Sequence, residues 1–447
     1  APRIPEALHC AAGQAPLRRA PAARSKLGTV PFHLAHLAPR VRTLYMALRH
    51  EWQGLKSTSS HSPAPSASRR LRLAYVSPLP PARSGIADYS AELLPALAQY
   101  YDIDIMIEQP SLSDAWISSH CGVRDAKWLL DNPTLYDRVL YHFGNSSNHQ
   151  HMFHLLTKVP GIVVLHDFYL GDVLNYLEAY AIDAFACQRD LYKSHGYGAL
   201  VTRSLAGQFA KVAEQYPANL EVLQLAQGVI VHSQYSKQLA NIWYGPQLAE
   251  HWSVIPLLRL PNSKMDRNAA RQALGLKPSD FIVCSFGLLG PTKLNHRLLQ
   301  AWLDSVLAVD ETCKLVFVGE VPATEYGAQM KQAVQASGLQ HRIHISGWTD
   351  PTRYRQYLMA ADLAVQLRAN SRGETSAAVL DCLNYGLPTI VNAHGSLAEL
   401  SHDTVCLLAD DFEDAALTKA IDTLWQDVNR RQTLGQLGRK CIETLHA

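Results

Sequence analysis

The feature that most constrains the fold of this 447-residue chain is a pattern that occurs twice, in which short apolar runs alternate with amphipathic stretches. In the first half the apolar runs are "LRLAYVS" (71–77), "YDIDIMI" (101–107), "RVLYHF" (138–143), "GIVVLHD" (161–167) and "GVIVHS" (228–233). After "WSVIPLLRLP" (252–261) the pattern restarts with "DFIVCSFG" (280–287), "KLVFVG", "RIHISG", "ADLAVQL" and "PTIVN". Such alternation indicates parallel strands covered by helices. The sequence therefore predicts an α/β fold with two doubly wound units joined near Pro256.

The first 70 residues differ in composition from the rest of the chain. Residues 1–30 are rich in Ala, Pro and Arg, residues 31–55 fit one or two amphipathic helices, and "STSSHSPAPSAS" (57–68) is typical of a linker. Ligands of doubly wound sheets bind beyond the carboxyl ends of the strands, so we expect a cleft between two such units. The predicted parts are a basic extension (1–70), a first Rossmann-like domain (71–256) and a second one (257–447).

Positive charge is concentrated in this extension. Residues 1–70 contain eleven Lys and Arg against two acids, Glu6 and Glu51, which is a net charge of +9. Because the whole chain carries +2, residues 71–447 carry −7. The main body therefore offers no general electrostatic argument for nucleic acid. The extension is either a loosely ordered tail or a contact for an anionic membrane surface or a partner.

The cysteines and the apolar runs favour a cytoplasmic protein, in which peripheral contact with the inner face of a membrane stays open. The eight cysteines are scattered without a CxxC pair, and several lie in apolar runs such as "FIVCSF". This is typical of reduced, buried thiols rather than of a disulfide framework. No apolar run approaches the roughly 18–20 residues of a transmembrane helix, and the beginning of the sequence lacks a continuous apolar signal-peptide core.

The segment "SRGETSAAVLDCLNYGLPTIVN" (371–392) predicts a helix that faces a ligand. Gly386 suits the left-handed position after a helix, and Pro388 cannot continue one. At the other end Thr375 or Ser376 can cap the helix, whose free N–H groups attract anions, phosphates above all. Asp381 lies one turn into the helix. The alternative is an ordinary capped helix in an α/β core, with Asp381 as a satisfied surface acid.

The series of motifs over residues 71–447 resembles the retaining, family-4 nucleotide-sugar glycosyltransferases (glycosyl transferases group 1, bacterial surface-polysaccharide type), which have the GT-B fold. The signature of that family is a Glu-x7-Glu helix followed by a Gly-Pro turn and a strand. With "LNYGLPTIVN" aligned, Asp381 matches the second acid and Gly373 falls at the first, one residue before Glu374. The resemblance implies that Glu374 binds the donor sugar and that Asp381 accepts the two ribose hydroxyls of the nucleotide. Thr375 and Ser376 would bind the diphosphate through their N–H groups.

The resemblance also assigns the cations of the second domain. "FGLLGPTK" (286–293) is similar to a family loop with a glycine, here Gly287, an arginine and a lysine. Lys293 matches the lysine that neutralises the departing diphosphate, a charge that grows in the transition state. The family arginine falls at Leu288, so half of the cationic clamp is missing. We expect Arg372 to replace it, because a guanidinium group can bind phosphate through two hydrogen bonds at once, with Arg368 as the alternative.

In the first domain the resemblance points to three loops. "SPLPPARSGIADYS" matches the loop that closes over the phosphates, where Gly85 would let the backbone approach. "VVLHDFYLGD" matches the His-Asp segment of the family, so His166 would bond the donor sugar while Asp167 orients it or the loop. Asn145 and His149 belong to a Gly-Asn-Ser-x-x-His stretch that would line the acceptor side.

Three histidines in the first domain also suggest a metal site. His149, His151 and His154 stand at i, i+2 and i+5, and these positions do not share one helix face. No carboxylate or cysteine accompanies them, so a zinc site is not favoured. The resemblance likewise implies neither metal nor cofactor.

The sequence thus predicts a retaining, metal-independent hexosyltransferase that moves a sugar, mannose from GDP-mannose by analogy, to a saccharide or lipid-linked saccharide hydroxyl. One alternative is a sugar-nucleotide epimerase of the same fold, which would convert the donor without an acceptor. Another is a non-catalytic glycosyltransferase-like binding subunit. A hydride-transfer enzyme is excluded because neither glycine loop has the GxGxxG pattern with an acid about 20 residues later.

Overall fold

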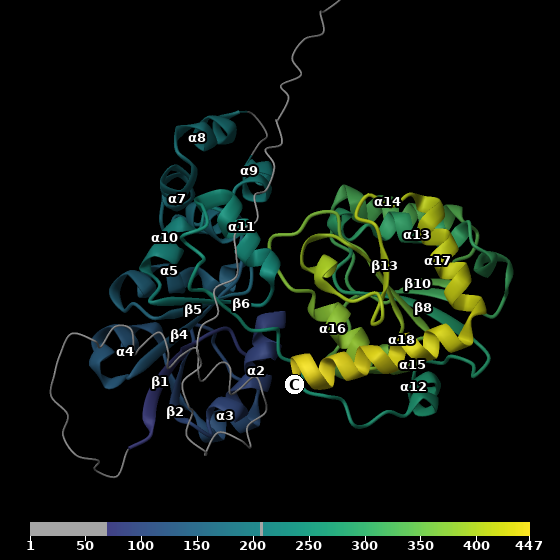
Figure 1. Ribbon diagram of the computed structural model, residues 1–447, viewed down its shortest axis with the longest axis horizontal. Coiled ribbons are helices and arrows are strands. Elements are labelled where there is room, and N and C mark those ends of the chain that lie inside the picture. Colours follow the sequence, from purple (N-terminus) through teal and green to yellow (C-terminus); the bar gives the residue numbers. More distant parts are fainter. Residues whose placement is uncertain (1–68, 206–208) are drawn as a thin grey trace, which may run out of the picture. The chain divides into compact units, whose positions relative to one another are not determined.

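The computed structural model describes residues 69–205 and 209–447 (Figure 1). The extension predicted over residues 1–70, with its proposed membrane contact, lies outside the described residues except for Arg69 and Arg70. In the described part of the chain no helix combines the length and the apolar character that a bilayer span requires.

The first lobe contains a seven-stranded parallel sheet in the order β3-β2-β1-β4-β5-β6-β7. Its strands are β1 (Leu71–Val76), β2 (Tyr101–Met106), β3 (Gly122–Arg124), β4 (Arg138–Phe143), β5 (Ile162–Leu165), β6 (Gly228–Val231) and β7 (Ser253–Val254). Its α-helices are α2 (Gly85–Leu97), α3 (Ala115–His120), α4 (Ala126–Asp131), α5 (Gln150–Lys158), α6 (Gly171–Ala179), α7 (Ala186–His195), α8 (Tyr197–Ser204), α9 (Phe209–Gln215), α10 (Leu220–Leu225) and α11 (Gln234–Tyr244). Two 3-10 turns, η2 (Pro133–Leu135) and η3 (Ser147–His149), flank β4.

The second lobe repeats this plan with a six-stranded parallel sheet in the order β10-β9-β8-β11-β12-β13. Its strands are β8 (Phe281–Phe286), β9 (Cys313–Val318), β10 (Ile343–Ile345), β11 (Leu363–Gln366), β12 (Thr389–Asn392) and β13 (Cys406–Leu408). Its helices are α12 (Arg267–Ala273), α13 (Asn295–Leu303), α14 (Glu325–Ala336), α15 (Pro351–Ala360), α16 (Ala377–Asn384), α17 (Asp414–Gln426) and α18 (Val428–Cys441). Short turns are η4 (Pro291–Lys293), η5 (Val306–Val309), η6 (Gly395–Glu399) and the C-terminal η7 (Ile442–His446).

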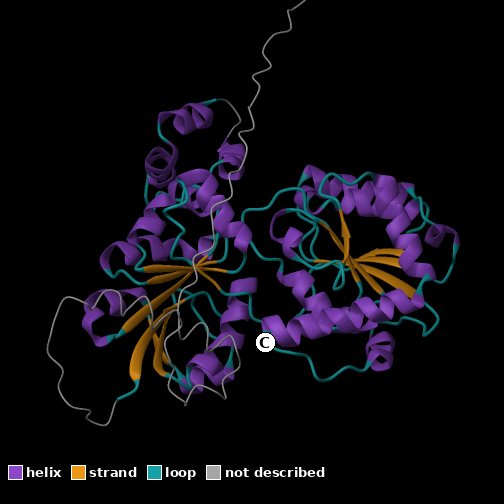
Figure 2. Cartoon of the chain, viewed as in Figure 1, coloured by secondary structure: helices purple, strands orange, loops and turns teal. Residues whose placement is uncertain are grey.

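The burial of the strands explains why their sequences are apolar throughout. All six residues of β8 are buried, because helices cover both faces of the sheet (Figure 2). Successive residues of one strand enter opposite cores: Leu73 and Tyr75 of β1 belong to one buried cluster, whereas Ala74 and Val76 belong to another. The predicted two-unit α/β fold is confirmed.

The structure adds elements that the pattern did not reveal. Among the described residues, α6 to α10 lie between β5 and β6, and the first four of these helices share a small core of their own. Edge strands such as β3 and β13 are three residues long, too short for a periodic signal. Five cysteines of the described residues are buried thiols, as the sequence predicts: Cys121, Cys187, Cys284, Cys313 and Cys382.

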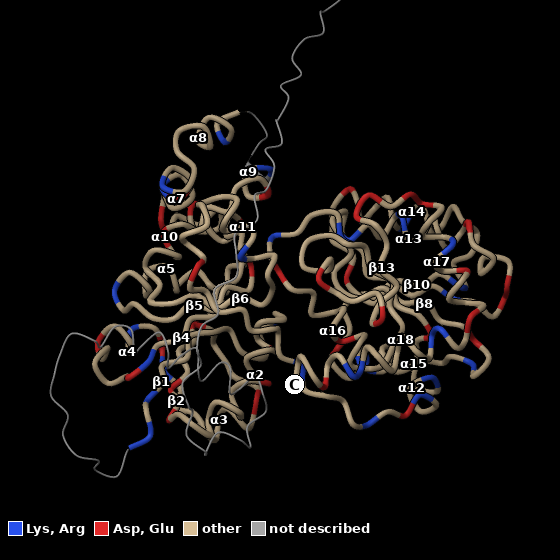
Figure 3. The backbone as a smooth tube through the Cα atoms, viewed as in Figure 1, with Lys and Arg blue, Asp and Glu red and all other residues tan. Residues whose placement is uncertain are grey.

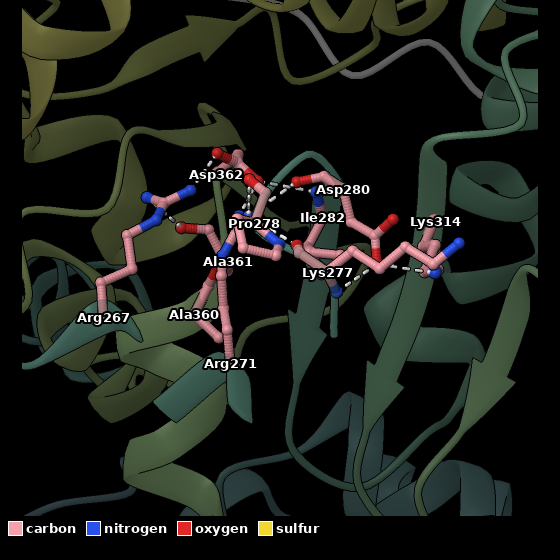
Figure 4. A network of polar contacts seen from close by, with 10 residues as sticks. All are labelled: Arg267, Arg271, Lys277, Pro278, Asp280, Ile282, Lys314, Ala360, Ala361 and Asp362. Carbon is pink, nitrogen blue, oxygen red and sulfur yellow. Dashed lines mark hydrogen bonds and ion pairs between the residues drawn. The ribbon is translucent and has the colours of Figure 1, made fainter. Parts of the chain in front are cut away.

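A dense polar network lies at the amino-terminal edge of the second sheet (Figure 4). Arg271 donates to the carbonyl of Ala360, at 3.1 Å from Nε and 3.0 Å from Nη2, and to the carboxylate of Asp362, at 2.7 Å. Its Nη1 donates to the carbonyls of Lys277, Pro278 and Asp280. Since each nitrogen of the guanidinium has a partner, this cluster fastens α12 and α15 to the sheet rather than offering a ligand site. Elsewhere, acidic and basic residues are interspersed over both lobes (Figure 3).

Candidate active site

The candidate site lies at the carboxyl edge of the second sheet, where the strand order reverses between β8 and β11. Gly287 follows β8 directly, and Arg368 comes two residues after β11. Ligands of open α/β sheets bind at this kind of switch point. The N–H of Ala369 donates to the carbonyl of Thr292 at 2.9 Å, which joins the two loops.

Lys293 is the central cation of this edge. Burial is the main reason that the pKa of its ammonium group falls to about 7, and the positive charge of Arg368 lowers it further. The carboxylate of Glu374 acts in the opposite direction. Two cations and one carboxylate therefore share a poorly solvated space, and an anionic ligand placed there would stabilise the charged form of Lys293.

Glu374 is held by its own loop. Its Oε2 accepts hydrogen bonds from the N–H of Arg372 at 2.6 Å and from the hydroxyl of Ser371 at 3.3 Å. Its Oε1 lies 3.9 Å from Nε of Arg368. The carboxylate is thus aimed at the cations while it keeps the capacity to accept further hydrogen bonds.

The first turn of α16 has no side-chain cap. Ser376 is the N-cap residue, as predicted, but its hydroxyl accepts no hydrogen bond from the helix. Among the described residues the buried hydroxyl oxygen of Thr375 has no hydrogen-bond partner. Since no side chain caps this turn, its N–H groups remain donors for a ligand such as phosphate.

Gly373 stands where the aligned family motif has its first acid. Its φ is +82°, and a β-carbon there would lie 2.5 Å from Cβ of Phe168. Such a position favours glycine, and the acid of this loop, Glu374, stands at the next residue.

Asp381 makes two bonds that the sequence did not predict. Its Oδ1 accepts a hydrogen bond from Nε of Arg259 at 2.8 Å, and its Oδ2 accepts one from the Tyr354 hydroxyl at 3.1 Å. Arg259 is only 5% exposed. Each carboxylate oxygen retains a lone pair, so the ribose role of Asp381 stays a prediction. Sequence reasoning missed Arg259 because one arginine in "VIPLLRLP" carries no signal of its own.

The two arginines considered for the second cation, Arg372 and Arg368, lie in different surroundings. The guanidinium of Arg372 pairs with Asp172 of α6, and its Nη2 lies 4.0 Å from a second acid, Glu214 of α9. Arg372 is therefore engaged by the first lobe, whereas Arg368 is the arginine beside Lys293 and Glu374. The side chain of Leu288, at the position of the family arginine, is 57% exposed.

His166 is the middle member of three buried histidines in the first lobe. His142 Nδ1 lies 3.0 Å from His166 Nε2, and His166 Nδ1 lies 3.1 Å from His232 Nε2. His232 Nδ1 donates to the carbonyl of Ile255 at 2.8 Å, so each ring carries its proton on Nδ1 when all three are neutral. Burial lowers the pKa of His142 and of His166 far below the usual value. A hydrogen bond from His166 to a donor sugar would have to replace one of these contacts.

The other predicted first-lobe residues are also engaged within the protein. The carboxylate of Asp167 accepts a hydrogen bond from the N–H of Asn145 at 2.8 Å, and burial, then the charge of Glu374, raises its pKa to about 6. The ring of His149 is buried against Gly144, and its Nδ1 contacts Ser146. A β-carbon on Gly85 would meet no atom within 4 Å, so this glycine faces open space.

Two further features bear on ligands. Trp348, which follows β10, is 51% exposed, and the guanidinium of Arg83 lies 4.2 Å from its ring centroid. An exposed ring at this edge offers a stacking surface that the sequence analysis did not single out. Within the described residues no three His, Cys, Asp or Glu side chains form a group suited to a metal ion, and His149 and His151 belong to no such group.

Comparisons with known proteins bear on the second lobe and on the fold. Residues 266–441 match the family model described as Glycosyl transferases group 1. None of the curated proteins matches the chain in sequence.

Several solved structures match over most of their length. Anabaena Alr3699/HepE in complex with UDP and glucose is 15% identical, with 84% of this chain and 96% of that chain covered and a TM-score of 0.60. Sucrose-phosphate synthase from Thermosynechococcus elongatus is 18% identical (84% and 95% covered, TM-score 0.58). WaaG, a glycosyltransferase involved in lipopolysaccharide biosynthesis, is 16% identical (84% and 96% covered, TM-score 0.54). The chain therefore has the GT-B fold, as predicted.

Proposed function

We propose, from a second lobe that matches the group 1 glycosyl transferases and a chain with the GT-B fold, that this protein transfers a hexose from a nucleotide sugar to a saccharide or lipid-linked saccharide hydroxyl. The observation that carries the proposal is the grouping of Lys293, Arg368 and Glu374 beside the uncapped first turn of α16. Two cations and a helix N-terminus suit a diphosphate, and a carboxylate suits sugar hydroxyls.

In the proposed reaction the bond between the anomeric carbon and the diphosphate oxygen breaks. Negative charge grows on that oxygen, and Lys293, Arg368 and the N–H groups of α16 stabilise it. The acceptor oxygen bonds to the anomeric carbon from the same face, and its proton passes to the leaving phosphate. Glu374 would hold the hydroxyls of the donor sugar, and the first lobe would hold the acceptor. Retention of configuration and independence of metal ions are parts of the proposal.

The donor proposed from the sequence is GDP-mannose, whereas structures of HepE contain UDP and UDP-glucose. The sharpest test is calorimetry with UDP and with GDP, each measured in excess chelator and again in magnesium. We expect micromolar to millimolar binding of one nucleotide in both conditions, and loss of that binding in Lys293→Met. Binding that a chelator abolishes would contradict the metal-independent part of the proposal.

Product analysis separates the alternatives. UDP-glucose and GDP-mannose are each incubated with the protein, with and without simple sugar acceptors, and the products are followed by NMR. Transfer or slow hydrolysis with retained anomeric configuration would support the glycosyltransferase. Conversion of the donor to its epimer without an acceptor would favour the epimerase. Tight nucleotide binding without turnover of any donor would favour a binding subunit.

A further inference from the structure

The loop between β11 and α16, residues 371–374, is bonded directly to the first lobe. The carbonyl of Arg372 accepts hydrogen bonds from the N–H groups of Phe168 at 2.7 Å and of Tyr169 at 3.2 Å. The carbonyl of Gly373 accepts one from the hydroxyl of Ser236 at 2.7 Å. The Arg372 guanidinium adds an ion pair with Asp172. Two consecutive residues therefore use both carbonyls and one charge to hold the first lobe.

The backbone at Gly373 is specialised for this contact. A side chain there would collide with Phe168 and would lie 3.2 Å from Leu239, both residues of the first lobe. The close approach that brings the Arg372 carbonyl onto the first lobe thus requires a glycine at the next position.

The partner of Arg372 is itself fixed in place. Asp172 accepts a hydrogen bond from the side-chain amide of Asn145 at 3.0 Å, and the backbone N–H of Asp172 donates to that amide oxygen at 2.9 Å. The backbone N–H of Asn145 in turn donates to Asp167. Asn145, predicted to line the acceptor side, therefore ties the N-terminus of α6 to the end of β5.

Arg372 also fixes the position of the Glu374 carboxylate, which belongs to the same loop (residues 371–374, here called the donor loop). Its backbone N–H is the 2.6 Å donor to Oε2 of Glu374, while its carbonyl and guanidinium contact the first lobe. A displacement of Arg372 would consequently move the carboxylate of Glu374 relative to Lys293 and Arg368. One residue thus connects the first lobe to the acid of the donor loop.

We propose that Arg372 is a positioning residue, which through its ion pair with Asp172 anchors the donor loop to the first lobe and orients Glu374 toward the donor sugar. The proposal rests on the proposed function, because that function assigns the donor sugar to Glu374. It differs from direct phosphate binding in one respect that can be measured: the loss of Asp172 should have the same consequences as the loss of Arg372.

Hydrogen exchange tests the anchor without any need for activity. In Asp172→Ala and in Arg372→Ala, the N–H groups of Phe168 and Tyr169 should exchange at least tenfold faster than in the wild type. The matched control is Asp183→Ala, which removes an ion pair of similar exposure with Arg189 on the same lobe and should leave these two rates unchanged. Unchanged rates in both test variants would overturn the anchor. If either alanine variant does not fold, Asp172→Asn and Arg372→Lys replace them, with an intermediate acceleration expected.

Kinetics test the consequence for turnover. Arg372→Ala and Asp172→Ala should each lower kcat at least fivefold, and the double variant should be no slower than either. The Kd of the nucleoside diphosphate should change by less than twofold, because neither side chain touches it. Weaker nucleotide binding in Arg372→Ala alone would show a phosphate ligand instead and overturn the proposal. If the wild type turns over no donor, the proposed function and the orienting role toward the donor sugar fall together, while the exchange rates still decide whether the ion pair anchors the loop.

Discussion

The ammonium nitrogen of Lys293 occupies the space that a side chain at Gly287 would need: an added β-carbon would lie 2.3 Å from Nζ. The φ of Gly287 is +101°, a conformation that other residues rarely adopt. The lack of a side chain at Gly287 therefore permits the turn after β8 and leaves room for the ammonium group of Lys293.

Gly287→Ala should consequently displace Lys293 and weaken binding of the nucleoside diphosphate at least tenfold, about 1.4 kcal/mol. Gly290→Ala is the matched control in the same loop, because its backbone is extended and the nearest atom to an added β-carbon is 4.0 Å away. Calorimetry on both variants decides the matter. Equal affinities would contradict the assignment of Lys293 to the diphosphate.

The depressed pKa of Lys293 predicts a pH dependence of binding. The free protein holds this pKa at about 7, and a bound diphosphate favours the ammonium form and raises it. Above pH 7 binding must then take up a proton, so affinity should fall by up to about tenfold per pH unit between pH 7 and 9. Calorimetry in buffers of different ionisation enthalpy measures how many protons are taken up on binding. In Lys293→Arg, which stays charged, the dependence should disappear; a wild-type affinity that is constant to pH 9 would refute the prediction.

The pair of Arg259 and Asp381 should contribute to stability as well as to the site. Arg259→Met leaves Asp381 with one hydrogen-bond partner, the Tyr354 hydroxyl. It also affects Asp88 and Glu92: burial raises the pKa values of both carboxyl groups, and the positive charge of Arg259, which partly offsets this rise, would be lost. Breaking a buried ion pair costs about 3 kcal/mol. We expect a clear fall in the denaturant midpoint, and little change in Lys127→Met, whose ion pair with Asp131 is exposed. An unchanged midpoint in Arg259→Met would mean that this pair contributes no net stability.

The same pair changes how the predicted ribose contact has to be tested. Asp381→Ala would leave the buried Arg259 without its partner, so a loss of nucleotide affinity could reflect unfolding. Asp381→Asn retains an acceptor oxygen and is the better variant. We expect Asp381→Asn to weaken nucleotide binding with a smaller loss of stability than Asp381→Ala. Thermal unfolding with and without nucleotide would measure both effects.

The three neighbouring histidines predict lower stability in acid. Burial is the first cause that keeps the pKa values of His142 and His166 far below the usual value of about 6.5, and the neighbouring rings add to it. The unfolded chain therefore binds more protons than the folded one below pH 6.5, so stability is full above that pH and lost as the pH falls. Each such histidine adds up to about 1.4 kcal/mol per pH unit to the slope of the free energy of unfolding against pH. Chemical unfolding from pH 7.5 to 5 should show a shallower slope for His142→Phe; equal slopes would refute the prediction.

Much of the fold follows from local patterns that the sequence displays openly. Apolar runs such as "FIVCSF" predict strands buried on both faces, and Gly386 with Pro388 predicts the end of α16. Edge strands of two or three residues carry too little periodicity to be predicted in this way. The resemblance to the family motifs likewise assigned Lys293 and Glu374 to the candidate site, and the helix start at Thr375 and Ser376 predicted its anion-binding turn.

Only the tertiary structure decided which charges face one another. Arg368 and Arg372 are four residues apart in one loop, and nothing in their local sequence indicates that one lies beside Lys293 while the other pairs with Asp172, 200 residues away. The same is true of Arg259 and Asp381, and of the three histidines at the ends of β4, β5 and β6. Periodicity and turn chemistry are short-range properties that the chain encodes residue by residue. Charge pairing and close backbone approach depend on which segments the packed sheets bring together, and that is settled only when the whole chain has folded.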